Sequence, residues 1–337
     1  MVRLVSSCTT IMTKKVSREN KTSLYITDNT FLPILFGEND SNIATIESLL
    51  NVEISLSNNM LNIFGDSTDI HTGKKLIEGL EECYHKGFAL TGKTVEEAAR
   101  IIHENQDVNL VKFFLEPIIH NYRNKPVIPK TLAQKEYIEI IKQFDVVFSL
   151  GPAGTGKTYL AMAMAIHYLH KQKADRIILT RPVRETGEKL GFLPGTLYEK
   201  INPYLQPLYD ALHDMVGSDV AVSMVEKGTI EVAPLAFMRG RTLNDSFIIL
   251  DEAQNTTHEQ MKMFLTRLGQ NSKAIITGDI TQIDLTGGRE SGLLEAIRIL
   301  QDVPEIGFAR LTHTDVVRHT IVKKIIKAYE RLEKRNK

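Results

Sequence analysis

The sequence contains no tryptophan and only two cysteines, Cys8 and Cys83, among 337 residues. The cysteines stand far apart, so the sequence predicts neither a disulfide framework nor a cysteine metal site, which favours a reducing compartment. No apolar run approaches the roughly 18 residues of a membrane span. Neither sign of charge is in excess, because Lys plus Arg and Asp plus Glu both number 41. A surface for a polyanion would therefore be a local patch, and we expect a cytoplasmic protein.

The first residues also lack the continuous apolar core of a secretory signal. Four cations precede the first acid, Glu19. We expect residues 1–22 to form a disordered tail, and an organelle-targeting segment is the alternative.

The rest of the chain is long enough for two domains. Residues 23–90 alternate in the order βαββα and predict a small α+β domain, with a hairpin turn at 57–59. The order is reminiscent of KH-type RNA-binding domains, but "GENDSN" (37–42) supplies no G-x-x-G loop. RNA binding and oligomer assembly are alternative functions of this small domain. The expected strands are 24–27, 52–56 and 60–64, and the expected helices are 40–50 and 69–85.

Residues 91–128 predict a helical linker that begins behind a capping Thr91 and ends in the proline-containing stretch 124–130. From residue 129 to 337, short apolar runs alternate with helical stretches. This pattern is typical of a parallel sheet that helices cover on both faces. The runs are 146–150, 176–180, 229–234, 246–250 and 274–278.

The stretch "GPAGTGKT" follows the first of these runs and precedes a helical pattern. Its glycines let backbone N–H groups converge on phosphate oxygens at a helix N-terminus. Lys157 should reach the β and γ phosphates, and the Thr158 hydroxyl should ligate Mg²⁺. A plain glycine turn before a helix is the alternative. The predicted phosphate-binding residues are Gly151, Pro152, Ala153, Gly154, Thr155, Gly156, Lys157 and Thr158.

Two acids end the apolar run "SFIIL". Asp251 would hold Mg²⁺ through water, and Glu252 would orient and activate the attacking water. Helix capping by the pair is the alternative. The next strand ends with Thr277, Asp279 and Gln282, where parallel sheets bind ligands. We interpret Gln282 as a γ-phosphate sensor, and a turn or cap role is the alternative for Asp279.

Together these residues resemble the first motor domain of superfamily 1 helicases, through the glycine loop, "DEAQ" (251–254) and "GDITQ" (278–282). Gln134 stands where that class reads adenine, which implies ATP. The resemblance implies a RecA-like P-loop NTPase domain at 129–337.

The stretches 181–195, 201–212 and 315–319 ("DVVRH") narrow the match. They resemble the PhoH family of bacterial ATPases over roughly residues 25–335. That resemblance implies cytoplasmic ATP binding and hydrolysis, links to RNA metabolism, and a YbeY-type endoribonuclease or ribosomal factors as partners.

A helicase of this superfamily has a second RecA-like domain that supplies an arginine, and this chain has room for one such domain. An arginine that neutralises transition-state charge raises the rate by about 10³–10⁵. We expect a neighbouring subunit of a homo-oligomeric ring to supply it, and an arginine in cis is the alternative. Arg318 is the first candidate and Arg289 the second. For either residue, a surface ion pair is an equally weighted alternative to the arginine-finger role.

The segment after the second strand is a candidate surface for single-stranded nucleic acid, because it combines cations with aromatic rings. An insertion packed on its own domain is the alternative reading. The basic helix predicted at 322–337 is read as a packed helix with a solvated cationic face. The candidate residues are Arg181, Arg184, Lys189, Phe192, Tyr198 and Tyr204.

Together these patterns predict an oligomeric, Mg²⁺-dependent ATPase that acts on RNA or an RNA–protein complex. The alternative is a nucleotide-gated binding module with incidental turnover. A small-molecule kinase is disfavoured, because neither a lid-like arginine cluster nor an acceptor motif is evident.

Overall fold

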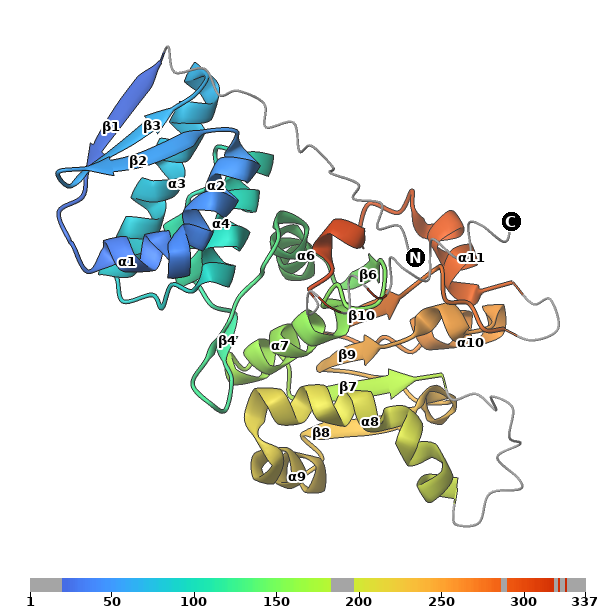
Figure 1. Ribbon diagram of the computed structural model, residues 1–337. Coiled ribbons are helices and arrows are strands. Elements are labelled where there is room, and N and C mark those ends of the chain that lie inside the picture. The colour runs from blue at the N-terminus through green and yellow to red at the C-terminus, as the bar shows by residue number, and fades with distance from the viewer. Residues whose placement is uncertain (1–19, 183–196, 286–289, 318–320, 322–324, 326–337) are drawn as a thin grey trace, which may run out of the picture. The chain divides into compact units, whose positions relative to one another are not determined.

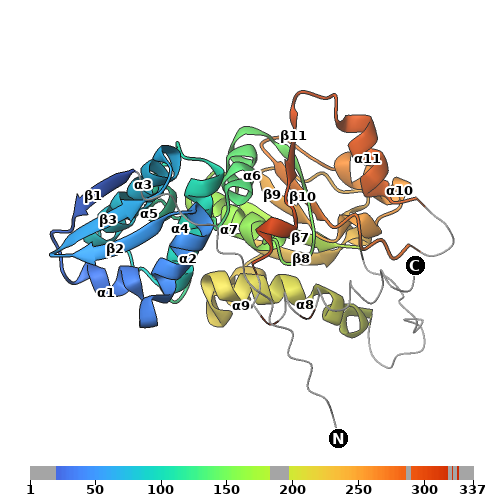
Figure 2. The ribbon, with the colours of Figure 1, turned by 45° about the horizontal axis from the view of Figure 1, so that its top comes forward.

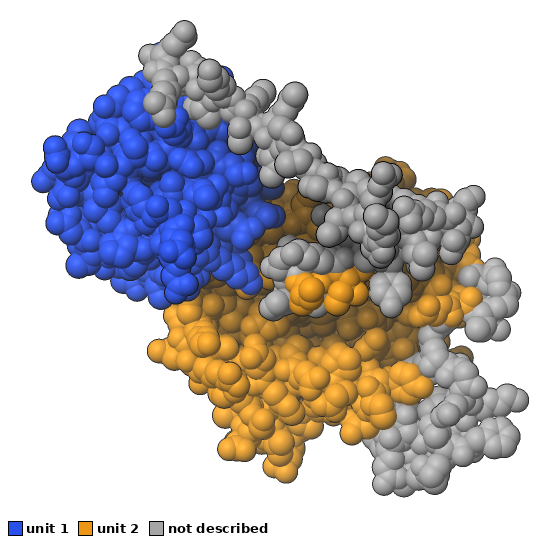
Figure 3. All heavy atoms as spheres, viewed as in Figure 1, with its two compact units in different colours: residues 1–116 blue, residues 117–337 orange. Residues whose placement is uncertain are grey.

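The structure is a computed structural model that describes residues 20–182, 197–285, 290–317, 321 and 325. It divides into two compact units, residues 1–116 and 117–337, which Figure 3 distinguishes by colour. Among the described residues, no helix is long and apolar enough to cross a membrane. Most of the predicted tail and most of the predicted C-terminal helix lie outside the described residues.

Unit 1 begins with a three-stranded antiparallel sheet in the order β1-β3-β2. The hairpin turn between β2 and β3 falls where the sequence places it. Asn58 and Asn59 both have positive φ, as a tight hairpin turn requires. Strand β1 starts inside the segment expected to be a tail, and α1 is an element that the sequence pattern did not predict. The elements are β1 (Lys21–Tyr25), α1 (Phe31–Phe36), α2 (Ser41–Leu50), β2 (Glu53–Ser57), β3 (Met60–Phe64) and α3 (Ser67–His85).

Two further helices, α4 (Gly92–Glu104) and α5 (Leu110–Leu115), complete unit 1. Thr91 caps α4 by accepting a hydrogen bond from the Thr94 N–H. Helix α4 packs on α2 and α3, and α5 packs on α3. Because both helices bury apolar side chains against this unit, the compact unit extends to residue 116, beyond the expected end of the small domain.

Unit 2 is built on a six-stranded parallel sheet in the order β11-β6-β10-β9-β7-β8 (Figure 1). All five predicted apolar runs are strands of this sheet. Strand β11 was missed, since its half-buried sequence "IGFAR" lacks a continuous apolar run. The elements are β4 (Ile119–His120), β5 (Pro126–Val127), α6 (Leu132–Gln143), β6 (Val146–Leu150), α7 (Lys157–His170), β7 (Arg176–Arg181), α8 (Leu197–Val216), α9 (Ser218–Glu226), β8 (Ile230–Pro234), β9 (Ser246–Leu250), α10 (His258–Leu265), β10 (Lys273–Gly278), α11 (Gly292–Leu300) and β11 (Ile306–Arg310).

Both faces of this sheet are buried under helices (Figures 1 and 2). Successive strand residues face opposite sides. In β9, Phe247 and Ile249 pack with α6, α7 and α8, whereas Ile248 and Leu250 pack with α10 and α11. This two-sided burial explains why the strands read as continuous apolar runs. Unit 2 therefore has the predicted architecture of a RecA-like P-loop NTPase, a parallel sheet covered by helices.

Candidate nucleotide site

Strand order alone brings the predicted site loops together. The glycine loop follows β6, and the acidic pair follows β9. Strand β10 lies between them and pairs in parallel with both. Because the carboxyl ends of parallel strands share one edge of the sheet, the loops after all three strands meet there.

The glycine loop is shaped by conformations that favour glycine. Gly156, immediately before α7, has φ of 84°, a left-handed value that strains other residues. A Cβ on Gly151 would lie 2.4 Å from the Leu311 carbonyl oxygen. The loop thus presents its backbone at the N-terminus of α7, which is a favourable place for phosphate oxygens.

Lys157, the first residue of α7, is buried with 9% of its surface exposed. Its ammonium donates hydrogen bonds to the carbonyls of Gly151, at 2.6 Å, and Pro152, at 2.9 Å. Its own carbonyl accepts from the Tyr137 hydroxyl at 3.3 Å. Burial raises the pKa of the Tyr137 phenol, so this hydroxyl remains a donor. The lysine charge is therefore held at the mouth of the loop.

Asp251 lies opposite the start of α7 and is 7% exposed. Its Oδ1 accepts hydrogen bonds from the hydroxyls of Thr158 and Thr277, both at 2.6 Å. A carboxylate beside a threonine hydroxyl is a donor set that suits Mg²⁺, which takes few protein ligands together with substrate phosphates. The pair Thr158 and Asp251 therefore fits the predicted metal position.

Glu252 belongs to a hydrogen-bond network that reaches back to the glycine loop. Its Oε2 accepts from Gln254 Nε2 at 2.5 Å, and Gln254 Oε1 accepts from the Asp279 N–H at 3.0 Å. The Asp279 carboxylate in turn accepts from the Ala153 N–H at 3.0 Å. Asp279 also caps its own turn by accepting from Thr281. Sequence reasoning gave Gln254 no separate role, although it stands in the "DEAQ" stretch.

The other oxygen of Glu252, Oε1, lies 3.2 Å from Arg181 Nη2. The same guanidinium donates from Nη1 to the Tyr204 carbonyl in α8, also at 3.2 Å. Arg181 was predicted as a nucleic-acid contact, and its structural partners are a carboxylate and a helix. Of the other polymer candidates, Arg184, Lys189 and Phe192 lie outside the described residues, and so does the side chain of Tyr198.

Gln134 lies against the glycine loop. Its Nε2 donates to the Thr155 carbonyl at 3.0 Å, and its Oε1 accepts from the Lys130 N–H at 2.7 Å. Each amide atom keeps capacity for one more hydrogen bond, because an amide nitrogen has two hydrogens and its oxygen two lone pairs. The residue is 3% exposed, and its two hydrogen bonds tie the side chain to the glycine loop and to Lys130.

These loops enclose a cavity of about 240 Å³. The cavity brings together the predicted lysine, metal-site pair, water-activating acid and phosphate sensor. Among the described residues, its lining consists of Ala153, Gly154, Gly156, Lys157, Thr158, Tyr159, Asp251, Glu252, Gly278, Asp279 and Gln282.

The segment after β11 runs along the glycine loop. The Leu311 N–H donates to the Leu150 carbonyl at 2.8 Å, and the Val317 N–H donates to the Gly154 carbonyl at 3.0 Å. The sequence pattern did not reveal this contact. The two arginine-finger candidates, Arg289 and Arg318, lie outside the described residues.

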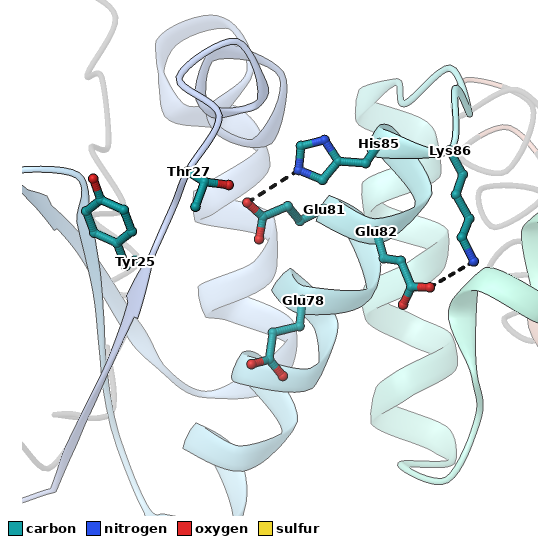
Figure 4. Close-up of a pocket in the computed structure, with 7 residues that line it drawn as sticks. All are labelled: Tyr25, Thr27, Glu78, Glu81, Glu82, His85 and Lys86. Atoms are coloured by element: carbon teal, nitrogen blue, oxygen red, sulfur yellow. Dashed lines mark ion pairs between the residues drawn. The ribbon is translucent and has the colours of Figure 1, made fainter.

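Unit 1 contains a second hollow, of about 360 Å³, with a different chemistry (Figure 4). Three glutamates, Glu78, Glu81 and Glu82, line it beside His85 and Lys86. The histidine pairs with Glu81 and the lysine with Glu82, as the dashed lines in Figure 4 show. This acidic lining would repel phosphates, so the hollow does not support RNA binding at this part of unit 1.

The family model and the similar proteins found by comparison all carry the same family description. A family model described as PhoH-like protein matches residues 126–330. PhoH-like proteins of Mycobacterium bovis and Bacillus subtilis are 49% and 48% identical, over 89% and 88% of this chain and 85% and 93% of their own lengths. Protein PhoH of Escherichia coli is 43% identical over 60% of this chain and 58% of its own length.

Among solved structures, the SWI2/SNF2 ATPase core of Sulfolobus solfataricus in complex with dsDNA aligns with a TM-score of 0.33. The identity is 17%, over 53% of this chain and 43% of that one. This likeness is too weak to support a functional argument.

Proposed function

The chain belongs to the PhoH family, and on that premise we propose that it is a Mg²⁺-dependent ATPase. One observation carries the proposal: Lys157, Thr158 and Asp251 line a single cavity at the carboxyl edge of the sheet. Fixed donors around one cavity stabilise the charge that develops during phosphoryl transfer.

Each residue has a definite task in this proposal. The loop N–H groups and the Lys157 ammonium hold the β and γ phosphates, while Thr158 and Asp251 would hold the metal. When bound, Mg²⁺ would neutralise charge on the phosphate oxygens. Glu252 accepts a proton from the water that attacks the γ phosphorus, and ADP leaves. Gln282, which also lines the cavity, orients the γ phosphate.

Nucleotide binding and turnover test the proposal separately. Purified protein should bind ATP in magnesium buffer and release phosphate. Lys157→Ala should abolish binding, whereas Glu252→Gln should retain binding and lose turnover. Lys171→Ala, at the exposed C-terminal end of the same helix, is the matched lysine control. Failure of wild-type protein to bind ATP would contradict the proposal.

We propose further that turnover is coupled to RNA or a ribonucleoprotein, in the cytoplasm, with a YbeY-type endoribonuclease or ribosomal factors as partners. The family resemblance motivates this coupling. Single-stranded and structured RNA should each be added to the ATPase assay, beside Glu252→Gln. Several-fold stimulation supports coupling, whereas flat turnover with nucleotide-dependent partner capture would favour the gated binding module.

The arginine that completes the site is proposed to be Arg318, with Arg289 second, acting within a homo-oligomeric ring. Val317, the residue before Arg318, bonds Gly154 of its own chain, a contact that favours the alternative of an arginine in cis, so the two routes need a direct test. Mixing Lys157→Ala with Arg318→Ala protein separates the routes. Recovered turnover indicates an arginine supplied by a neighbour, and no recovery indicates an arginine in cis.

A further inference from the structure

Arg181 contacts two residues of unit 2, Glu252 and Tyr204, that are far apart in the sequence. One hydrogen-bonding edge of its guanidinium faces Glu252, and another faces the Tyr204 carbonyl of α8. The side chain of Arg181 is 22% exposed and that of Glu252 is 34% exposed, so the pair is only partly screened by water. Arg181 itself is not among the described residues that line the nucleotide cavity.

Glu252 is held on both oxygens in this arrangement. Gln254 donates a hydrogen bond to Oε2 from the network that contacts the glycine loop, whereas Arg181 forms an ion pair with Oε1 from outside that network. Glu252 also has φ of 51° and ψ of 39°, a left-handed conformation that costs a non-glycine residue energy. The guanidinium occupies one acceptor position of Oε1, so water that is to lose a proton to this oxygen has only the other position.

Helix α8 offers a reason for the second contact. It contains Pro203 and Pro207, and a proline inside a helix removes one backbone hydrogen bond and kinks the axis. Pro207 has no N–H, so the carbonyl of Pro203, four residues earlier, lacks its helical partner, and Tyr204 lies in the same turn. Both prolines are exposed, whereas Leu205 and Leu208 are buried, so the prolines themselves contribute little to the core.

We propose that Arg181 is a positioning residue that restrains Glu252, and that displacement of α8 releases the carboxylate for proton transfer. The inference rests on the proposed ATPase function. Minor conformational states are commonly populated at about 0.1–10%, so permanent release should raise kcat by about tenfold or more. The nucleotide contacts are untouched, and KM should therefore stay unchanged.

The test compares kcat and KM of the full chain with those of Arg181→Met, which keeps the aliphatic stem and removes every donor. We expect a higher kcat, an unchanged KM, and loss of all turnover when Glu252→Gln is added. Arg181→Lys keeps the charge and should give an intermediate kcat. Arg176→Met, on the same strand, is the matched control, since Arg176 bonds Ser246 instead.

A fall in kcat in Arg181→Met would overturn the proposal, because it would make Arg181 a supporting cation of the active arrangement. An unchanged kcat would overturn it as well. If Arg181→Met does not fold, Arg181→Lys carries the same test. Pro207→Ala restores the missing backbone N–H in this turn of α8 and should raise kcat in the same direction, and an unchanged kcat there would overturn the link to α8. Loss of ATP turnover in wild-type protein would instead contradict the ATPase function itself.

Discussion

The hydroxyl of Thr158 lies 2.6 Å from Asp251 Oδ1, although 93 positions separate the two residues in the sequence. Thr277, on the strand between their loops, donates to the same oxygen at the same distance. Two hydroxyls on one carboxylate oxygen fix its direction and leave Oδ2 as the second acceptor. The pairing makes Thr277 a support for a proposed metal ligand.

Thr277→Val removes one of these hydroxyls without changing the shape of a fully buried site. Loss of a partner that orients a metal ligand typically costs about 10–100-fold in affinity or activity. We expect Mg²⁺-dependent turnover to fall within that range, with a higher Mg²⁺ requirement. ATP turnover measured over a series of Mg²⁺ concentrations gives both the maximal rate and the Mg²⁺ requirement. Thr266→Val, at the C-cap of α10, is the control because that hydroxyl bonds carbonyls of its own helix and the neighbouring Arg267, and does not contact Asp251. An unchanged Mg²⁺ requirement would contradict the role of Thr277.

Gln134→Ala separates loop anchoring from recognition of the base. Loss of the hydrogen bonds to Thr155 and Lys130 should lower the affinity for every nucleotide. Loss of a bidentate contact to adenine should lower the affinity for ATP alone. Because the amide has spare capacity on both atoms, we expect ATP affinity to fall more than GTP affinity. A discrimination loss of about 1–3 kcal/mol corresponds to one good bidentate contact. Equal losses for the two nucleotides would leave anchoring as the only role.

Local patterns were enough to predict that the three candidate site loops follow strands of one parallel sheet. The glycine loop, the acids after β9 and the residues after β10 each follow a continuous apolar run, and the parallel sheet brings their ends together. Periodicity was informative there because both faces of the sheet are buried. The hairpin at Asn58 and Asn59 was equally readable, since asparagine tolerates positive φ.

Long-range contacts were not readable in the same way. The pairing of Arg181 with Glu252 depends on β7 lying beside β9, an order that periodicity does not encode. The packing of α4 and α5 on α2 and α3 depends on apolar faces whose partners lie elsewhere in the chain. Strand β11 was missed because its burial alternates at a sheet edge. These features arise from tertiary packing, which overrides local preference.

Gly151→Ala should damage the glycine loop through a clash with the segment after β11. The added methyl would lie 2.4 Å from the Leu311 carbonyl oxygen. Overpacking typically costs about 1–3 kcal/mol, and a domain of this size loses about 2–4 °C in Tm per kcal/mol. Thermal unfolding and ATP affinity should both fall. Gly228→Ala is the matched control, since Gly228 has φ of 72° but no atom within 4 Å of its added Cβ. A fall in Gly228→Ala as large as that in Gly151→Ala would argue against the clash.

His167 should make the stability of unit 2 depend on pH. Burial lowers its pKa first, and the charges of Lys171, Lys142 and Lys173 lower it further, against a backbone hydrogen bond with Ile118. The free histidine has a pKa of about 6.5, so below that pH the unfolded chain takes up a proton that the folded chain still refuses. The free energy of unfolding should therefore fall as pH drops below about 6.5 towards the folded pKa. Above about pH 6.5 it should keep its full value.

His167→Gln should flatten this pH dependence, because glutamine can still donate to the Ile118 carbonyl but does not titrate. Thermal unfolding of wild-type and variant protein across this pH range is the measurement. His170→Gln, exposed near the end of the same helix, should leave the wild-type slope in place. A wild-type Tm that rises on acidification, or a slope that survives in His167→Gln, would show that other groups dominate the acid response.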